Sequence, residues 1–317
     1  MRSALCVLPL LLVWSCHRED RLTSMRIDPA VATLIPAETR LLAGIKLDKI
    51  RDTPTYQKHF AQLPIPQLDK FAAQVGIDPR KDIWEVLFCS NGKDNGVLMV
   101  RGKFAPPDME PKLEREGATR FAHKGYSLFG DERNAMFFMT PSTALAGSTT
   151  VLKAIIDNRD KGGAGIPAAL KPLVDALPND AQLWAAFDGI MVTMPFREDS
   201  NLGNVNTMIR SLNSGWVSAD LRTGLDLRAT GNCRDDASAK QIHDALRGVI
   251  GMGRLSTPDN QPDLLRAFDG IKVDQNGNIV NITAQVPQDL VDKVADMFLT
   301  SSPRGSRLPG SLIPHPR

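Results

Sequence analysis

The same order of short strands and helices occurs twice along this chain, and that repetition limits the folds it can adopt. Residues 34–43 contain Pro36, an acidic residue, a leucine and an alanine. The same residue types recur at the same spacing in residues 177–185. The matching pairs, such as Pro36 and Pro178, all lie 142 positions apart. So long a period indicates two related units, not a short-period solenoid. The sequence therefore predicts an α+β fold of two related halves, each an antiparallel sheet covered by helices.

Turn and capping residues mark the individual elements in both halves. The Asn-Gly pairs at 91–92 and 95–96 predict a hairpin between strands 83–90 and 96–104, and Asn276-Gly277 predicts another. Asp235 and Asp236 are expected to cap the helix 238–252, and the glycines at 248, 251 and 253 are read as its end. Further helices are expected at 68–75, 107–116, 149–158, 167–176, 204–212 and 287–298. Further strands are expected at 40–48, 119–121, 126–129, 135–140, 144–146, 215–221 and 224–233.

The element pattern also predicts where the units begin and end. A Gly-rich stretch, Lys161-Gly-Gly-Ala-Gly-Ile-Pro167, separates the two halves. The C-terminal segment, Ser301 to Arg317, is rich in proline and is expected to be a disordered tail. The predicted organisation is a signal peptide at 1–15, a tether at 16–30, a first half at 31–160, a linker with a helix at 161–176, a second half at 177–300 and the tail at 301–317.

The N-terminus has the pattern of an export signal. Arg2 precedes an apolar run, Leu5–Trp14, which is shorter than the roughly 20 residues needed to span a bilayer. The run ends Val13-Trp14-Ser15-Cys16, which resembles a bacterial lipobox except that Trp14 stands where a small residue is usual. That resemblance implies lipidation of Cys16 and attachment to a membrane. The alternatives are plain cleavage nearby and an uncleaved anchor.

Three segments of this chain resemble a group of bacterial proteins. They are Leu34-Ile-Pro-Ala-Glu38, Gly44-Ile-Lys-Leu-Asp48 and Gly76-Ile-Asp-Pro-Arg-Lys-Asp-Ile83. Together they resemble uncharacterised secreted or lipid-anchored bacterial proteins, whose mature part opens with such a strand and carries the Gly-Ile-Asp-Pro-x-x-Asp-Ile segment before the first hairpin. The resemblance covers most of residues 31–300. It implies an envelope location and an α+β architecture, and it assigns a role to no residue.

The cysteines that remain after export divide into an anchor and a pair. Removal of residues 1–15 leaves Cys16, Cys89 and Cys233. If Cys16 is acylated, the other two lie in an oxidising compartment, in which a disulfide between them can persist once formed. The favoured interpretation is that each is a small buried apolar residue, because nothing in the sequence brings the two together.

Charge and motifs exclude several functional classes. The 38 basic and 36 acidic residues nearly cancel, which argues against a nucleic-acid partner. Ser90 and Lys93 have the S-x-x-K spacing of serine acyl-enzymes, but they fall in a hairpin loop instead of at a helix start. Asp274-Gln-Asn-Gly-Asn278 resembles the opening of a calcium loop, with its glycine misplaced. His59, His123 and His243 show no zinc-ligand spacing. No catalytic residue, metal or cofactor is therefore expected.

These observations favour a non-catalytic protein of the bacterial cell envelope or periplasm. We expect a binding or structural module, tethered to a membrane by Cys16, with an unknown protein or small molecule as its partner. Two alternatives stay open. One is a carrier that holds an apolar ligand or lipid in a cavity, and the other is an uncharacterised hydrolase whose residues follow no linear motif.

Acylation of Cys16 makes a direct prediction. Mass spectrometry of the mature protein isolated from a bacterial envelope should show a diacylglyceryl-modified cysteine at its N-terminus. An unmodified N-terminus at another residue would contradict lipidation while leaving export intact.

Overall fold

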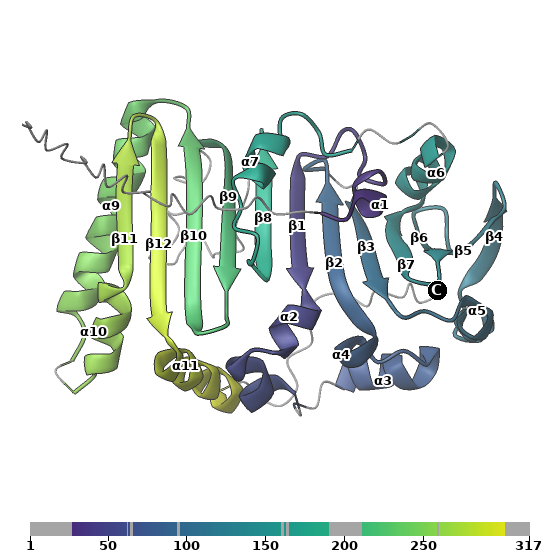
Figure 1. Ribbon diagram of the computed structural model, residues 1–317, viewed down its shortest axis with the longest axis horizontal. Coiled ribbons are helices and arrows are strands. Elements are labelled where there is room, and N and C mark those ends of the chain that lie inside the picture. Colours follow the sequence, from purple (N-terminus) through teal and green to yellow (C-terminus); the bar gives the residue numbers. More distant parts are fainter. Residues whose placement is uncertain are drawn as a thin grey trace, which may run out of the picture.

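The two halves of the chain share one sheet. The computed structural model describes residues 27–301, apart from 62, 64–65, 94–95, 160–161, 163–164, 190–210 and 259. Within these residues the strands form a 12-stranded antiparallel sheet in the order β11-β12-β10-β9-β8-β1-β2-β3-β7-β6-β5-β4 (Figure 1). The strands are β1 (Leu41–Lys46), β2 (Ile83–Ser90), β3 (Gly96–Gly102), β4 (Thr119–His123), β5 (Tyr126–Gly130), β6 (Asn134–Thr140), β7 (Thr143–Ser148), β8 (Leu183–Asp188), β9 (Leu212–Asp220), β10 (Gly224–Cys233), β11 (Ile271–Asn276) and β12 (Ile279–Pro287).

Helices lie on both faces and along one edge of this sheet (Figure 1). The described helices are α1 (Pro29–Ala32), α2 (Leu47–Arg51), the π-helix η1 (Tyr56–Phe60), α3 (Pro66–Val75), α4 (Pro79–Asp82), α5 (Pro106–Arg115), α6 (Thr149–Asn158), α7 (Lys171–Asp175), α9 (Asp236–Leu255), α10 (Pro262–Asp269) and α11 (Gln288–Ser301). The α+β class and the antiparallel strands expected from the sequence are present. The expectation of a separate sheet for each half is wrong, because β1 of the first half pairs with β8 of the second.

Most elements with strong local signals lie where the sequence places them. Strands β2 and β10 and helix α6 have the expected bounds, and Asp235 caps α9 by accepting a hydrogen bond from the Ser238 amide at 2.7 Å. Three expectations differ from the structure. Helix α10 was not anticipated, and α9 continues through its three glycines to Leu255. Of the helix expected at 204–212, residues 204–210 lie outside the described part, and Leu212 begins β9.

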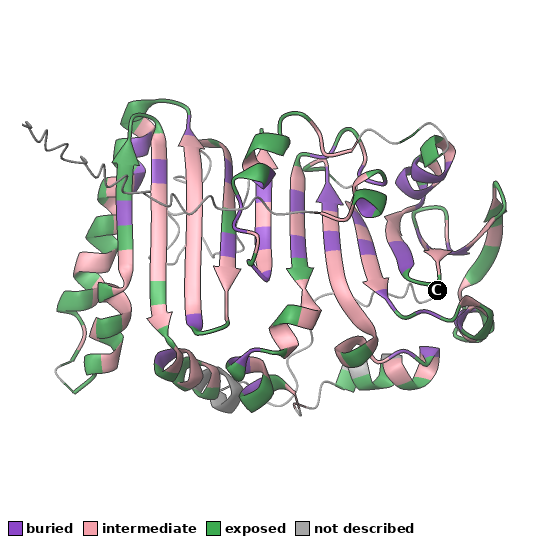
Figure 2. Ribbon diagram, viewed as in Figure 1, coloured by how far each residue is buried: buried purple, intermediate pink, exposed green. Residues whose placement is uncertain are grey.

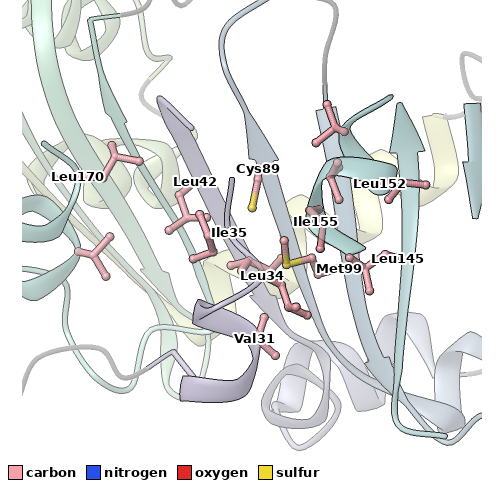
Figure 3. Packing of buried hydrophobic residues seen from close by; sticks show 14 of the residues in the cluster. Val31, Leu34, Ile35, Leu42, Cys89, Met99, Leu145, Leu152, Ile155 and Leu170 are labelled. Carbon is pink, nitrogen blue, oxygen red and sulfur yellow. The ribbon is translucent and has the colours of Figure 1, made fainter. Parts of the chain in front are cut away.

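One face of the sheet carries the main core, and we name it the Leu42 face. Leu42 on β1 pairs with Cys89 on β2, and both side chains are buried beneath helices α1 and α6. Side chains from α1, α6 and the strands interdigitate there (Figure 3). Helix α6 packs because its apolar residues recur at helical spacing on one side. The residues of α6 that enter this core are Val151, Leu152, Ile155 and Ile156.

The seam between the halves depends on a close glycine–tryptophan pair. Gly44 on β1 lies directly opposite Trp184 on β8, and both residues are on the Leu42 face. The absence of a side chain at Gly44 leaves room for the indole, and a Cβ added there would overlap the ring. An aromatic side chain that covers a glycine on the neighbouring strand is a known way to stabilise a sheet.

Two alanine substitutions with opposite expected signs test this packing. Gly44→Ala should lower the free energy of unfolding by about 1–3 kcal/mol, because it overpacks the seam. Gly248→Ala is the matched control, since a Cβ at this position in α9 meets no atom within 4 Å. It should raise stability by about 0.5–1 kcal/mol, as expected for removing a glycine from a helix interior. Urea denaturation of both variants measures the two values, and a stabilised Gly44→Ala protein would refute the packing argument.

Candidate binding face

The opposite side of the sheet, which we name the Ile45 face, is apolar across nearly the whole molecule. Directly paired residues of neighbouring strands lie on the same face, so the strand register identifies the residues of each row. One row crosses ten strands and a second crosses eleven, and neither contains a polar side chain. The first row is Ile271, Ala284, Leu227, Ala219, Leu183, Ile45, Val86, Val100, Ala144 and Phe138. The second is Val273, Ile282, Ala229, Val217, Ala185, Ala43, Phe88, Leu98, Ala146, Met136 and Phe129.

Helices cover the two ends of the Ile45 face. At one end α9 packs Ala239 and Ile242 against Val273 of β11 and Val280 of β12. At the other end Val75 of α3 and a pair of residues from α5 pack against strands β3, β6 and β7. Figure 1 shows α9 and α10 beside β11, α3 below the end of β3 and α5 near β4, so the two groups lie toward opposite ends of the sheet. The five strands between them are β10, β9, β8, β1 and β2.

The central stretch of the Ile45 face is incompletely buried. Ile45 is 37% exposed and Val217 is 38% exposed, and their neighbours in the two rows are half-buried. None of the ten central residues belongs to any of the three apolar clusters formed by the described residues. Figure 2 shows the contrast along β1, where buried positions of the Leu42 face alternate with more exposed positions of the Ile45 face. A contiguous apolar surface of this kind is typical of an interaction site.

Beyond β8 and helix α7, the Leu42 face of the second half is largely polar and contains a charged hollow. It is lined by Pro178, Asp180, Ala181, Ser218, Asp220, Arg222, Asp226 and Arg228. Arg222 forms ion pairs with Asp180 and Asp220, and Arg228 donates to Asp226 at 2.7 Å. Partial burial opposes ionisation of Asp220, but hydrogen bonds from Arg222 and Gln182 outweigh it and lower the pKa of the Asp220 carboxyl. The charges in this hollow therefore satisfy one another, and it is a weaker candidate for a ligand site than the Ile45 face.

The two remaining cysteines lie far apart in the fold. Cys89 is on β2 in the Leu42-face core, whereas Cys233 ends β10 beside α9. Strands β1, β8 and β9 separate them, which is roughly 19 Å at the usual strand spacing and well beyond disulfide reach. Both thiols are free and buried, so the disulfide alternative is not realised in this structure. Cys16 lies outside the described residues.

Motifs that resembled catalytic or metal sites have local structural roles. Ser90 ends β2, and its hydroxyl accepts a hydrogen bond from the Gly92 amide at 3.1 Å, so the S-x-x-K segment is a turn. Asp274–Asn278 is the β11–β12 hairpin, in which Gly277 has a φ of +56°. No group of three or more metal-ligating side chains occurs among the described residues.

Each histidine within the described part lies against aspartate. His123 is 2.8 Å from Asp157, and His243 is 2.9 Å from Asp244. His59 is buried between Asp292 and Asp296 of α11, a contact that the sequence spacing did not indicate. A pairing between helices near opposite ends of the chain leaves no periodic signal, so only the fold brings these groups together.

Comparison with known proteins assigns this chain to no family. No protein-family model matches the chain, and no curated protein matches it. The chain is similar to crystal form I of TP0453, with 8% identity over 87% of this chain and 98% of that one and a TM-score of 0.49. Crystal form III of TP0453 gives 7% identity, 87% and 99% coverage and the same TM-score. At this level the similarity has no bearing on function. No described helix is long and apolar enough to cross a membrane.

The burial of the two thiols predicts their reactivity. Burial raises the pKa of the Cys89 thiol to about 12, and burial together with Asp235 also raises the pKa of Cys233. Because the thiolate is the reactive form, neither residue should react with Ellman's reagent at pH 8 in the folded protein with Cys16 acylated. Both should react after unfolding in guanidinium chloride without reductant. If unfolding does not make two thiols reactive toward Ellman's reagent, Cys89 and Cys233 are not both free as the structure has them.

Proposed function

We propose that this chain is a non-catalytic binding module of the bacterial cell envelope, in which the Ile45 face is the binding surface. In this proposal the mature protein begins at an acylated Cys16, which holds it to a membrane, and the chain belongs among the secreted or lipid-anchored proteins that it resembles. The observation that carries the proposal is the pair of uninterrupted apolar rows, whose central residues remain partly exposed.

The chemistry of the Ile45 face favours an apolar ligand, such as the acyl chains of a lipid. Across the five central strands the two rows supply only hydrocarbon side chains, with neither a charge nor a hydrogen-bonding group. Protein interfaces generally have a polar rim and about one hydrogen bond per 100–200 Å². A surface that lacks such groups gains mainly by removing apolar area from water. The carrier of an apolar ligand is thus the form of binding module that this face supports best.

We infer that the two halves arose by duplication, and three features support this. The shift that relates Pro36 to Pro178 also moves α1 onto the start of α7 and β1 onto β8. In the β1–β8 ladder, Ala43 pairs with Ala185, its own counterpart under the same shift. Finally, the strand order β1-β2-β3-β7-β6 has the same connectivity as β8-β9-β10-β12-β11. A pseudo-two-fold axis then passes through the middle of the binding face.

A fluorescent fatty acid tests the binding face. Addition of 11-(dansylamino)undecanoic acid to the purified protein should raise the dansyl emission in a saturable manner. The double variant Ile45→Asn/Val217→Asn should weaken the affinity at least tenfold, because it places amides at the two most exposed positions of the central face. A tenfold change corresponds to about 1.4 kcal/mol, within the range expected for losing two apolar contacts.

Lys272→Asn is the matched control for this experiment. Lys272 is exposed on β11, and it alternates with Ile271 and Val273, so it lies on the opposite face. This variant should bind the probe as the unmodified protein does. Absence of saturable binding, or equal affinity of the double variant, would reject the Ile45 face as an apolar-ligand site.

A further inference from the structure

The Leu42 face of strands β9, β10, β12 and β11 carries mostly polar side chains. Directly paired residues share a face, so the strand register identifies the side chains on this surface. Two of its rows run from β11 to β9, and they are Lys272, Thr283, Arg228 and Ser218, and Asp274, Asn281, Thr230 and Trp216. The same four strands carry the apolar rows on their other side. The sheet of the second half therefore presents a polar surface opposite the Ile45 face.

The charged hollow includes Ser218 and Arg228 of this polar surface, and its charges nearly cancel. Its lining contains three aspartates and two arginines, which leaves one net negative charge. Lys46 lies close by, because its ammonium donates to the Asn179 carbonyl at 3.2 Å and is attracted by Asp180. Counted with Lys46, the positive and negative groups are equal in number. Clefts attract charged ligands when they are lined by charges of one sign, so this hollow favours neither an anion nor a cation.

The paired charges still leave hydrogen-bonding groups unused at the hollow. Ser218 is only 3% exposed, and its hydroxyl forms no hydrogen bond with any other described residue. Arg228 uses Nε and Nη2 on Asp226, and its Nη1 contacts no acceptor within the described part of the chain. Among the described side chains, only Arg222 donates to Asp180, and it does so through Oδ2. A buried hydroxyl normally has a hydrogen-bond partner, so the position of Ser218 points to a ligand.

The unused groups suit the hydroxyl groups of a sugar. Arg228 Nη1 is a donor, Asp180 Oδ1 is an acceptor and the Ser218 hydroxyl can take either role, whereas each sugar hydroxyl both donates and accepts. The hollow has a volume of about 80 Å³, enough for several waters and hence for the hydroxyl groups at one edge of a sugar ring. Trp216 lies two residues from Ser218 on the same face of β9, and its half-buried ring offers an apolar surface for the C–H groups of that sugar.

We propose that the hollow and Trp216 form a binding site for a neutral saccharide. Ser218, Arg228 and Asp180 hold adjacent hydroxyl groups of one sugar unit, and Trp216 packs against its ring. The polar rows toward β11 extend the surface for further sugar units. This site lies on the opposite side of the sheet from the Ile45 face, so it goes beyond the proposed function and does not depend on it.

Isothermal titration calorimetry of the full chain with three neutral oligosaccharides tests this site. The probes are maltotetraose, cellotetraose and N-acetylated chitotetraose, and at least one should bind saturably with a Kd of about 1 mM or lower. Ser218→Ala should weaken that binding about fivefold, and Arg228→Gln about tenfold. Each variant removes one hydrogen bond to the sugar, and the bond from a charged guanidinium is the stronger of the two.

Two other variants serve as controls. Arg254→Gln is the matched control, since Arg254 also pairs with a single aspartate, Asp269, but belongs to α9, which packs on the Ile45 face. It should bind the sugar as the unmodified protein does. The Ile45→Asn/Val217→Asn protein should also keep its affinity for the sugar. Failure of the apolar face and failure of the saccharide site are therefore observed separately.

Three outcomes would overturn the saccharide site. The first is the absence of saturable binding by all three oligosaccharides. The second is an unchanged affinity in either Ser218→Ala or Arg228→Gln. The third is tighter binding of inorganic phosphate than of every oligosaccharide, because a preference for an anion contradicts the balanced charge of the hollow.

Discussion

The pairing of β1 with β8 is the interaction on which the rest of the structure depends. It joins two sets of strands, each with its own helices, edge to edge in one sheet. Small residues let β1 and β8 pack closely at this seam. Ala43 pairs with Ala185 on the Ile45 face, and Gly44 leaves room for the Trp184 side chain on the Leu42 face. Without this ladder each half would expose two unpaired strand edges, which invite association with other chains.

Continuity of the sheet has opposite consequences for its two faces. On the Leu42 face, helices α1, α6 and α7 fill the core, and the second half is polar where they are absent. On the Ile45 face the helices lie only at the ends, so the apolar stretch at the seam stays partly exposed. This exposed apolar stretch is therefore a product of joining the halves, because the row through Ile45 and Leu183 does not exist in either half alone.

Local signals predicted most elements, and their failures have physical reasons. The Asn-Gly turns and the periodic apolar residues of α6 act within a few residues, so the sequence shows them directly. The glycines of α9 suggested an end to that helix, but packing of Ile242 and Leu246 on the sheet outweighs their helix propensity. Helix α10 was missed although Pro262 at its start and the amphipathic pattern of its residues are local helix signals. The contact of His59 with α11 joins segments from opposite ends of the chain and left no pattern at all.

By itself, the sequence determined the α+β class and the alternation of strands and helices, because these depend on residue order and short-range chemistry. The long internal repeat and the export-type N-terminus stay predictions made from the sequence. Tertiary structure decided whether the halves form two sheets or one, which face is left open, that Cys89 and Cys233 stay apart and that His59 meets two carboxylates. Each of these depends on strand order across the sheet. Strand order is fixed by which edges can pair and which apolar surfaces then meet, and that is a property of the assembled chain.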